Sequence, residues 1–491
     1  MLRMGRIEVM ETLLPVPVPA RDQSALSHYR MHQWELETLI IQLLFLPDAE
    51  MQTNTRGELD CSRFRTVVEL INRLRKLEDV ESALYLSENE FDVLNEMHRI
   101  AQRQFHWQRG YFNLPQFYRT AFIYSQGECG EYFQRTHGLP IAELNFVGFV
   151  YYAHSLRTPF TNLSNGISAI GLTTDLLDRA LPLLVCKLDE ARSETAALVE
   201  RVNKKHGRPI PTAYLPSVLR RRPLLSLDER PYEFIAPIPE MIAMRVTSGL
   251  YYDLIPGGQG LLNEANDRFE EYSRRLISAQ MERFEARRAY RYELKKGYSA
   301  DTPDILVRDG NRLALVIECK ATKLNYLAQF AEDPFETEKQ QYLQIANAVL
   351  QLWRFFSHIR QGFIDESIDP EASAMVLTLD SFLTLSRKLK ADILREANLL
   401  ADKDGSIVDE DRRQVVFCSI QTLEEILSIS NESEFLDTLK AARQEKYDGW
   451  EISSIYRDQS SGSRQSTQKP FPFALDDLLP WWERTSKLGS S

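Results

Sequence analysis

The sequence predicts an α+β/α protein, in which a helical N-terminal domain is followed by a mixed sheet flanked by helices. Through most of residues 1–205, apolar residues recur at three- and four-residue spacing, which is the spacing of amphipathic helices. After residue 257, short apolar runs alternate with helical patterns. Alternation of this kind is typical of a sheet that carries helices on its faces.

Length and composition are those of an ordinary globular protein. The 491 residues, 43% hydrophobic and 26% charged, can form about two to four domains with substantial cores. No apolar run reaches the roughly 18 residues of a membrane span, and the N-terminal residues show no secretion signal, so we expect no membrane partner. The five cysteines are far apart and odd in number, which excludes a disulfide framework and a CxxC metal site and indicates a cytoplasmic protein.

We place the helical domain at residues 1–205. Its strongest helical patterns cover residues 28–46, 63–86, 87–105 and 173–205. Pro182 lies inside the last of these and must kink that helix or end its first turn.

A proline-rich, basic connector is predicted at residues 206–256. Prolines are concentrated before residue 240, and this composition breaks regular structure. Residues 201–230 hold eight Lys or Arg against two Asp or Glu, although the whole chain has a net charge of −11. A local basic strip of this kind either contacts phosphates or is a solvated linker, and composition leaves both open.

The α/β pattern occupies residues 257–452. In chain order we expect a helix at 261–288, a strand at 289–296, a hairpin at 302–323, a helix at 338–359, and strands at 374–379 and 413–420 on either side of a further helix. This order predicts a single mixed sheet with helices on its faces.

The remaining residues, 453–491, are expected to form a tail. Residues 456–470 are polar, which predicts a flexible segment. Aromatic residues return at 471–482, and this segment either docks on its own domain or binds a partner.

Charged residues end an apolar strand within the hairpin. Asp309-Gly310 offers the positive φ angles of a tight turn, and the strand after it is apolar up to Ile317. Glu318 and Lys320 then lie two residues apart, which places both side chains on one face of the strand and Cys319 on the other.

Asp304 stands near the start of the preceding strand, within reach of Glu318. A loop of about five residues would place the two carboxylates opposite each other, whereas a two-residue loop would place Asp304 about one pair away. Two carboxylates suit Mg²⁺, because this ion prefers oxygen ligands and keeps part of its hydration shell. Lys320, on the same face, can orient or deprotonate a water and offset charge on a phosphate.

Pro303-Asp304 and Glu318-Cys319-Lys320, thirteen residues apart, resemble the two halves of the motif of the PD-(D/E)xK nuclease family. The resemblance covers about residues 257–425 and implies a restriction-endonuclease-like fold. It also implies that Asp304 and Glu318 bind Mg²⁺, for which Mn²⁺ would substitute, and that Lys320 serves the attacking water.

The same resemblance implies two further catalytic residues. The family often has a glutamate on the helix before the sheet, and Glu270 in "RFEEY" is in that position. A glutamine or tyrosine on the following helix is also common. Gln344 is the first candidate there, with Gln341 and Tyr342 as alternatives.

The function implied is that of a Mg²⁺-dependent endonuclease, which hydrolyses phosphodiester bonds in nucleic acid, with DNA favoured over RNA. The consecutive Arg220, Arg221 and Arg222 are then expected to contact phosphates on the path to the site. A helical domain joined to one such module resembles bacterial anti-phage defence nucleases, which implies a phage or host protein as trigger; assembly into a homo-oligomer stays open. The alternative from another class is a catalytically inactive nuclease-fold protein that binds nucleic acid or protein.

Overall fold

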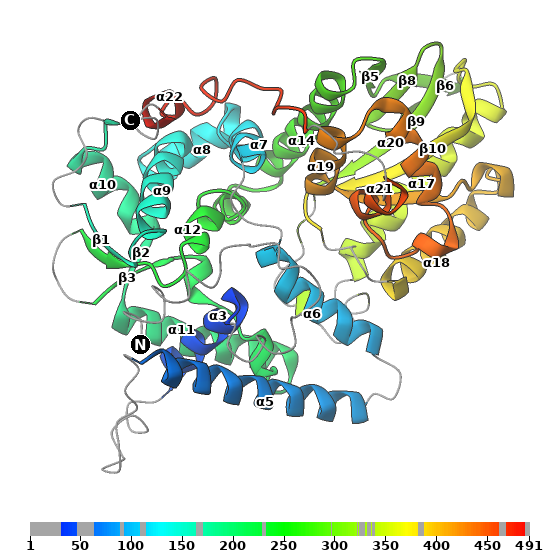
Figure 1. Ribbon diagram of the computed structural model, residues 1–491. Coiled ribbons are helices and arrows are strands. Elements are labelled where there is room, and N and C mark those ends of the chain that lie inside the picture. Colours follow the sequence, from blue (N-terminus) through cyan, green and yellow to red (C-terminus); the bar gives the residue numbers. More distant parts are fainter. Residues whose placement is uncertain are drawn as a thin grey trace. The chain divides into compact units, whose positions relative to one another are not determined.

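The computed structural model describes residues 31–46, 63–88, 93–108, 114–163, 170–227, 232–295, 297–321, 323, 329, 330, 335, 339–381, 387–460 and 468–486 (Figure 1). The chain divides into two compact units. The first comprises residues 1–92, 103–258 and 475–491, and the second comprises residues 93–102 and 259–474. Both contain helices and strands, so the mixed α/β class predicted for the chain is confirmed. None of the described helices is long and apolar enough to cross a membrane.

Helices form most of the first unit, as the apolar spacing predicts. Its longer helices are α3 (Gln33–Phe45), α5 (Phe64–Glu88), α7 (Leu114–Tyr124), α8 (Gly127–His137), α9 (Ile141–Ser155) and α11 (Leu188–His206), whereas most of α6 (Val93–Gln108) belongs to the second unit. Ile41 of α3 is fully buried and belongs to one apolar cluster with Leu225 and Met241. Segments far apart in the sequence therefore share a core.

The helix predicted at residues 173–205 is interrupted at Pro182. α10 (Thr174–Ala180) ends just before a 3₁₀ turn that contains this proline, and β2 (Val185–Lys187) then precedes α11. Inside a helix, a proline ring clashes with the carbonyl four residues earlier and supplies no N–H, which explains the break.

A small sheet in the first unit was not predicted. Its strands, in the spatial order β1-β4-β3-β2, are β1 (Phe160–Asn162), β4 (Glu233–Ile235), β3 (Leu224–Ser226) and β2. Each strand has three residues, which is too short for a pattern of alternating apolar residues to be recognised.

Residues 206–256, expected to form a connector, belong to the first unit and contribute to its core. Their prolines separate short elements, among them β3, β4, α12 (Glu240–Arg245) and α13 (Leu250–Leu254). Leu219, Leu224 and Met241 are fully buried. The prolines mark changes of chain direction, while the apolar residues between them hold the segment in place.

A five-stranded mixed sheet forms the centre of the second unit (Figure 1). Its strands, in the spatial order β11-β10-β9-β8-β5, are β11 (Val415–Ser419), β10 (Ile368–Thr378), β9 (Arg312–Lys320), β8 (Ile305–Asp309) and β5 (Phe284–Arg288). β5, β8 and β9 are antiparallel, whereas β9, β10 and β11 are parallel. α17 (Lys339–Arg360) and α18 (Arg387–Asp404) cover the face that carries Val316 and Val376, and α14 (Gln259–Gln280) packs against β5 and β9.

The edge strand β5 lies where the end of a helix was predicted. The helix expected at 261–288 stops at Gln280, and the chain then enters β5. In β5, buried Phe284 and Ala286 alternate with exposed side chains. This period-two pattern was missed because it directly follows a long charged helix with a similar composition.

A separate two-stranded sheet follows β5. It consists of β6 (Arg291–Lys295) and β7 (Tyr298–Asp301), which pair antiparallel. The strand predicted at 289–296 corresponds to β6, but it lies outside the five-stranded sheet. The pair returns the chain to the start of β8, where the N–H of Ala289 donates to the carbonyl oxygen of Asp304 at 3.0 Å.

The turn between β8 and β9 has two residues, Gly310 and Asn311, because Asp309 pairs with Arg312. Gly310 has a φ of 60°, a left-handed conformation that glycine adopts without steric cost. The turn predicted at Asp309-Gly310 was therefore one residue too early.

A β-bulge after this turn aligns the two strands. Ala314 is an extra residue on β9, and beyond it Ile305 pairs with Ile317. Asp304, one residue before Ile305, thus lies across from Glu318. Of the two loop lengths considered, the short one is observed, and the bulge supplies the alignment that a longer loop would have given.

The C-terminal aromatic segment docks on the chain itself. In the second unit, the rings of Phe473 and Tyr272 lie 5.9 Å apart. In the first unit, Trp481 is 5% exposed, and its ring lies 5.0 Å from that of Phe149 and 5.8 Å from that of Phe146. Of the two roles left open for this segment, the structure supports packing within the protein.

Replacing Trp481 with Ala should lower the free energy of unfolding by about 3 to 5 kcal/mol, because a buried aromatic ring is lost and a cavity is left among its neighbours. Denaturant titration followed by circular dichroism measures this change. Trp450→Ala, at a position 46% exposed, is the control and should change the free energy by less than about 1 kcal/mol. Equal losses in the two variants would contradict the docking of the tail.

Candidate active site

Three charged side chains meet where β8 begins and β9 ends. Oδ2 of Asp304 accepts a hydrogen bond from the backbone N–H of Cys319 at 2.7 Å. Nζ of Lys320 lies 2.7 Å from Oε1 of Glu318, whose side chain is only 3% exposed. The fold therefore brings together the three residues that the sequence motif singles out.

The apolar run of β9 explains why these charges lie at the end of the strand. Residues Leu313 to Ile317 are buried on both faces, as expected for a strand with a neighbour on each side and helices above and below. The strand continues through Lys320, with Glu318 paired to Val376 and Lys320 paired to Thr378 of β10. The two charged residues share the face of Val316 because they follow it at intervals of two.

Burial raises the pKa of both carboxyls. It is the main cause of the rise in the pKa of Glu318 to about 7, and the charge of Asp304 adds to this rise while Lys320 opposes it. Burial also raises the pKa of Asp304, although the N–H of Cys319 and the charge of Lys320 act against it. Like charges held with little water repel each other, so a cation between them would be stabilised.

Lys320 is positively charged in this site. Burial alone would lower the pKa of its ammonium, but Glu318 and Asp304 outweigh burial and raise it. A protonated lysine donates hydrogen bonds to water or phosphate and cannot take up a proton. Of the two roles open to Lys320, this environment favours orientation and charge compensation over deprotonation of a water.

α14 adds two further carboxylates. The pKa of Glu270 rises to about 8, first through burial and then through the charges of Asp304, Asp267 and Glu318. Glu270 is thus close enough to the strands to sense their charges, as its expected role requires. Asp267 was missed at the sequence level; it precedes Glu270 by three residues, a spacing that places two side chains on one side of a helix and was the available signal.

The glutamine expected on the next helix, Gln344, lies on α17. Gln344 is exposed on α17, and Gln341 is half-buried near the start of that helix. The amide oxygen of Gln341 is buried, and no hydrogen-bond partner for it lies in the described part of the chain. Tyr342 is fully buried with its ring 5.8 Å from that of Phe335, so it is a core residue. The catalytic role of Gln344 stays a prediction.

The side chains at this site offer oxygen ligands, which Mg²⁺ prefers. In the ranges that the structure describes, no group of three His, Cys, Asp or Glu side chains is arranged to hold a metal ion. The strands instead offer two carboxylates, Asp304 and Glu318, and Asp304 raises the pKa of Glu318. Mg²⁺ is commonly held through one or two carboxylates and keeps several waters. The residues present therefore fit a hydrated Mg²⁺ ion held through these two carboxylates.

The consecutive arginines of the first unit form ion pairs within that unit. Nε of Arg220 lies 2.8 Å from Oε1 of Glu37. Arg222 pairs with Glu194, and Arg221 is exposed. The segment is therefore less positive than its composition suggests, and its role in phosphate binding stays a prediction.

Comparisons with protein-family models, curated proteins and solved structures find no match to the chain. The fold and the site define the class of this protein. It is a mixed α/β protein in which two buried carboxylates, Asp304 and Glu318, lie on paired strands beside the ammonium of Lys320.

Stability should depend on pH through Glu270. Its folded-state pKa of about 8 lies above the value of an unfolded glutamate, about 4.3. The protonated carboxyl therefore favours the folded state below about pH 4, and this contribution is lost as the pH rises through about 8. In chelator, Glu270→Gln should match the wild type near about pH 4 and exceed its free energy of unfolding by at least about 1 kcal/mol near about pH 9.

Glu271→Gln, at the next residue, is the control for this measurement. Burial alone would raise the pKa of Glu271, but hydrogen bonds from Arg274, Arg288 and Arg275 hold it below its ordinary range. Its ionised form favours the folded state at neutral pH, and that contribution is lost only as the pH falls. Glu271→Gln should thus be less stable than the wild type at neutral and alkaline pH. If Glu270→Gln kept the pH dependence of the wild type, Glu270 would not have the raised pKa that burial and the charges of Asp304, Asp267 and Glu318 give it here.

Proposed function

We propose that the protein is a Mg²⁺-dependent endonuclease that hydrolyses phosphodiester bonds in nucleic acid, with DNA as the favoured substrate. One observation carries this proposal. Asp304 lies across from Glu318 on paired strands, and the Lys320 ammonium is 2.7 Å from Glu318. Buried carboxylates beside a protonated lysine suit a divalent cation, a water and a phosphate together.

The fold supports this proposal. The motif lies on two antiparallel neighbours of a mixed sheet, β8 and β9, with helices on both faces. Along the chain, α14, β5, β8, β9, α17 and β10 follow one another, with β6 and β7 as an insertion before β8. This arrangement is compatible with the restriction-endonuclease-like fold that the motif implies.

Each residue of the site would have its own role in phosphodiester hydrolysis. When bound, Mg²⁺ would offset charge on the phosphate and make a water more acidic. Asp304 and Glu318 would hold the ion, and the N–H of Cys319 keeps the Asp304 carboxylate in a fixed orientation. Lys320, now paired with Glu318, would turn toward the attacking water or a phosphate oxygen once Glu318 has another cation beside it. Glu270 would orient a water from α14.

A catalytically inactive binding protein is the second candidate. Such a protein has no need of three ionisable groups at one place. Glu318 is 2% exposed, and keeping a carboxylate there costs stability because its ionised form loses hydration. A destabilising cluster of this kind is typical of a functional site, which favours the enzyme.

Incubation of the purified protein with plasmid, linear duplex DNA, single-stranded DNA and RNA tests the proposal. We expect cleavage with Mg²⁺ or Mn²⁺ and none with chelator, and nicked or linear plasmid would indicate internal cleavage. A protein that cleaves no substrate with either metal, yet binds nucleic acid, would be the binding module instead.

Asp304→Ala, Glu318→Gln and Lys320→Ala should each lower the cleavage rate at least about a hundredfold. Their stabilities should differ. Glu318→Gln removes a repelling charge and should maintain or raise the unfolding temperature, whereas Lys320→Ala leaves Glu318 buried without its partner and should lower it. Plasmid cleavage and thermal unfolding measure both effects. Full cleavage by Lys320→Ala would exclude the role assigned to Lys320.

Mg²⁺ should also stabilise the protein in the absence of nucleic acid. An ion that binds only the folded state raises the free energy of unfolding by about 2.7 kcal/mol at a hundred times its Kd. Unfolding in a Mg²⁺ titration should show this rise for the wild type, a weaker response for Glu270→Ala and almost none for Asp304→Ala. Asp392→Ala, which removes an α18 carboxylate paired with Arg395, is the control and should respond like the wild type. An unchanged response of Asp304→Ala would contradict the metal assignment.

A further inference from the structure

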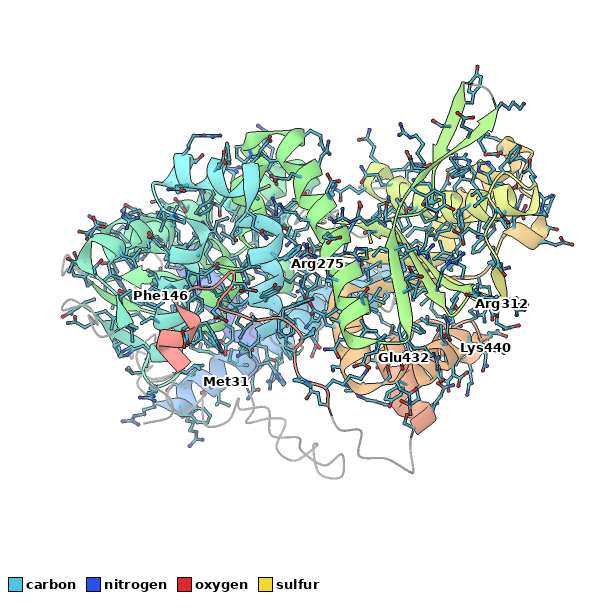
Figure 2. All side chains as sticks on the ribbon, turned by 90° about the horizontal axis from the view of Figure 1, so that it is seen from above. Met31, Phe146, Arg275, Arg312, Glu432 and Lys440 are labelled. Atoms are coloured by element: carbon cyan, nitrogen blue, oxygen red, sulfur yellow. The ribbon has the colours of Figure 1, made fainter. Side chains whose placement is uncertain are left out.

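The strands β6 and β7 form an antiparallel ribbon that buries none of its residues. Each of their side chains is exposed or half-buried, and the ribbon lies outside the five-stranded sheet. Figure 2 shows it, in green, projecting beyond the rest of the second unit. A two-stranded hairpin is only marginally stable in water by itself, so this β6–β7 ribbon adds little to the stability of the fold. Its length therefore indicates a role outside the core.

The root of the β6–β7 ribbon is fixed to the second unit. The hydroxyl of Tyr292 lies 2.6 Å from Nδ1 of His358, and the hydroxyl of Tyr290 donates to Oε1 of Glu366 at 3.1 Å. The N–H of Thr302 donates to the carbonyl oxygen of Tyr290 at 3.0 Å. These bonds define where the ribbon leaves the unit, so its tip is carried on an ordered base.

The root also adjoins the candidate active site. The N–H of Ala289 donates to the carbonyl oxygen of Asp304 at 3.0 Å, where the chain passes from the ribbon into β8. Tyr298, the first residue of β7, precedes Asp304 by six residues, and an extended chain of that length spans at most about 22 Å. The tip of the ribbon therefore stays within about 22 Å of Asp304 in any direction.

The tip of the β6–β7 ribbon carries a cation and an aromatic ring side by side. Lys295 pairs with Tyr298 across the ribbon, so the two side chains are neighbours on one face. Tyr298 is 72% exposed, and Lys295 is also exposed. No ion pair links Lys295 to a carboxylate of the described residues.

Positive charge is concentrated at this tip. Residues 291–301 hold three Lys or Arg against two Asp or Glu. Near the root, Arg291 and Asp301 neutralise each other, with Nε of the arginine 2.9 Å from Oδ1 of the aspartate. Lys295 is followed in the sequence by a second lysine, Lys296. The ribbon thus joins a basic tip to a root beside the acidic site.

We propose that the β6–β7 ribbon binds in the major groove of duplex DNA beside the phosphate held at Asp304 and Glu318, so that the substrate is double-stranded. This proposal rests on the proposed function. The major groove is about 12 Å wide and 8.5 Å deep and admits a two-stranded β-ribbon. The phosphate backbones border this groove, which places it within reach of a ribbon rooted at Asp304. At the tip, the Lys295 ammonium binds a backbone phosphate, and Tyr298 faces the edges of the bases.

The alternative occupant is a strand of a second copy of the chain. The outer edges of the ribbon offer backbone N–H and C=O groups with which another strand can pair. However, β6 carries the charged residues Arg291, Glu293 and Lys295, and its register shifts between Glu293 and Lys295. Charges and irregularities of this kind protect an edge against pairing with another molecule, which favours DNA.

The experiment compares two double variants, each built on Glu318→Gln so that the DNA is not cleaved. Lys295→Ala/Tyr298→Ala removes the side chains of the tip and leaves the root intact. Lys403→Ala/Trp450→Ala is the matched control, since it removes one exposed lysine and one exposed aromatic residue from the same unit. Binding of labelled duplex DNA and of single-stranded DNA is measured, with thermal unfolding and sedimentation velocity in parallel.

The tip variant should bind duplex DNA at least about tenfold more weakly than its parent, because contacts to the groove are lost. It should keep the parent's affinity for single-stranded DNA and the parent's unfolding temperature, since both side chains are exposed. The control should keep both affinities. Methylation of guanine N7, which lies in the major groove, should weaken duplex binding by the parent more than methylation of adenine N3 in the minor groove, and the tip variant should lose this difference.

A tip variant that binds duplex DNA like its parent would overturn the proposal. The same holds if it loses as much affinity for single-stranded DNA, if the control loses as much affinity for the duplex, or if adenine N3 methylation has the larger effect. A changed oligomeric state with unchanged duplex binding would assign the ribbon to a second copy of the chain. Should the wild type neither cleave nor bind any nucleic acid, the proposed function itself would fail, which is a distinct result.

Discussion

Asp304 and Glu318 carry like charges on neighbouring strands, in a place with little water. The free energy that this arrangement costs must come from the surrounding sheet, and the local structure shows how it is offset. β9 is buried between β8 and β10, so its backbone cannot move to separate the two carboxylates. The Cys319 N–H and the Lys320 ammonium each stabilise one of them. A cation at this place would remove most of the remaining repulsion.

Two consecutive glutamates of α14 show how strongly surroundings decide the behaviour of one residue type. Glu270 faces other carboxylates, and its pKa rises to about 8 through burial and their charges. Glu271 meets three guanidinium groups, and its pKa falls below the ordinary range although burial opposes this. One helix thus carries one glutamate in an acidic environment and the next in a basic one.

The hairpin that carries the motif could be predicted because its determinants are local. A glycine turn and an apolar run specify two strands, and alternation places Glu318 and Lys320 on one face. The alignment of Asp304 with Glu318 could not be predicted, since it depends on an extra residue, Ala314, that the sequence does not mark. Asp267 was missed for a related reason. The role of a carboxylate on a charged helix cannot be inferred before the strands that pack beside the helix are known. The sheet of three-residue strands in the first unit depends on pairings between distant segments, such as Phe160 with Ile235. Local sequence patterns do not indicate such pairings.

The order in which the units take their residues from the chain affects how the protein can fold during synthesis. The first unit includes residues 475–491, so its last segment is made only after the whole of the second unit. Until then, Phe146 and Phe149 lack the Trp481 ring that packs against them in the finished protein. Domains made early usually fold first, yet here the unit that begins earlier is completed only by residues that follow the second unit in the chain. For the same reason neither unit corresponds to a continuous fragment, and a chain cut at residue 258 would release a first unit with part of its aromatic core open to solvent.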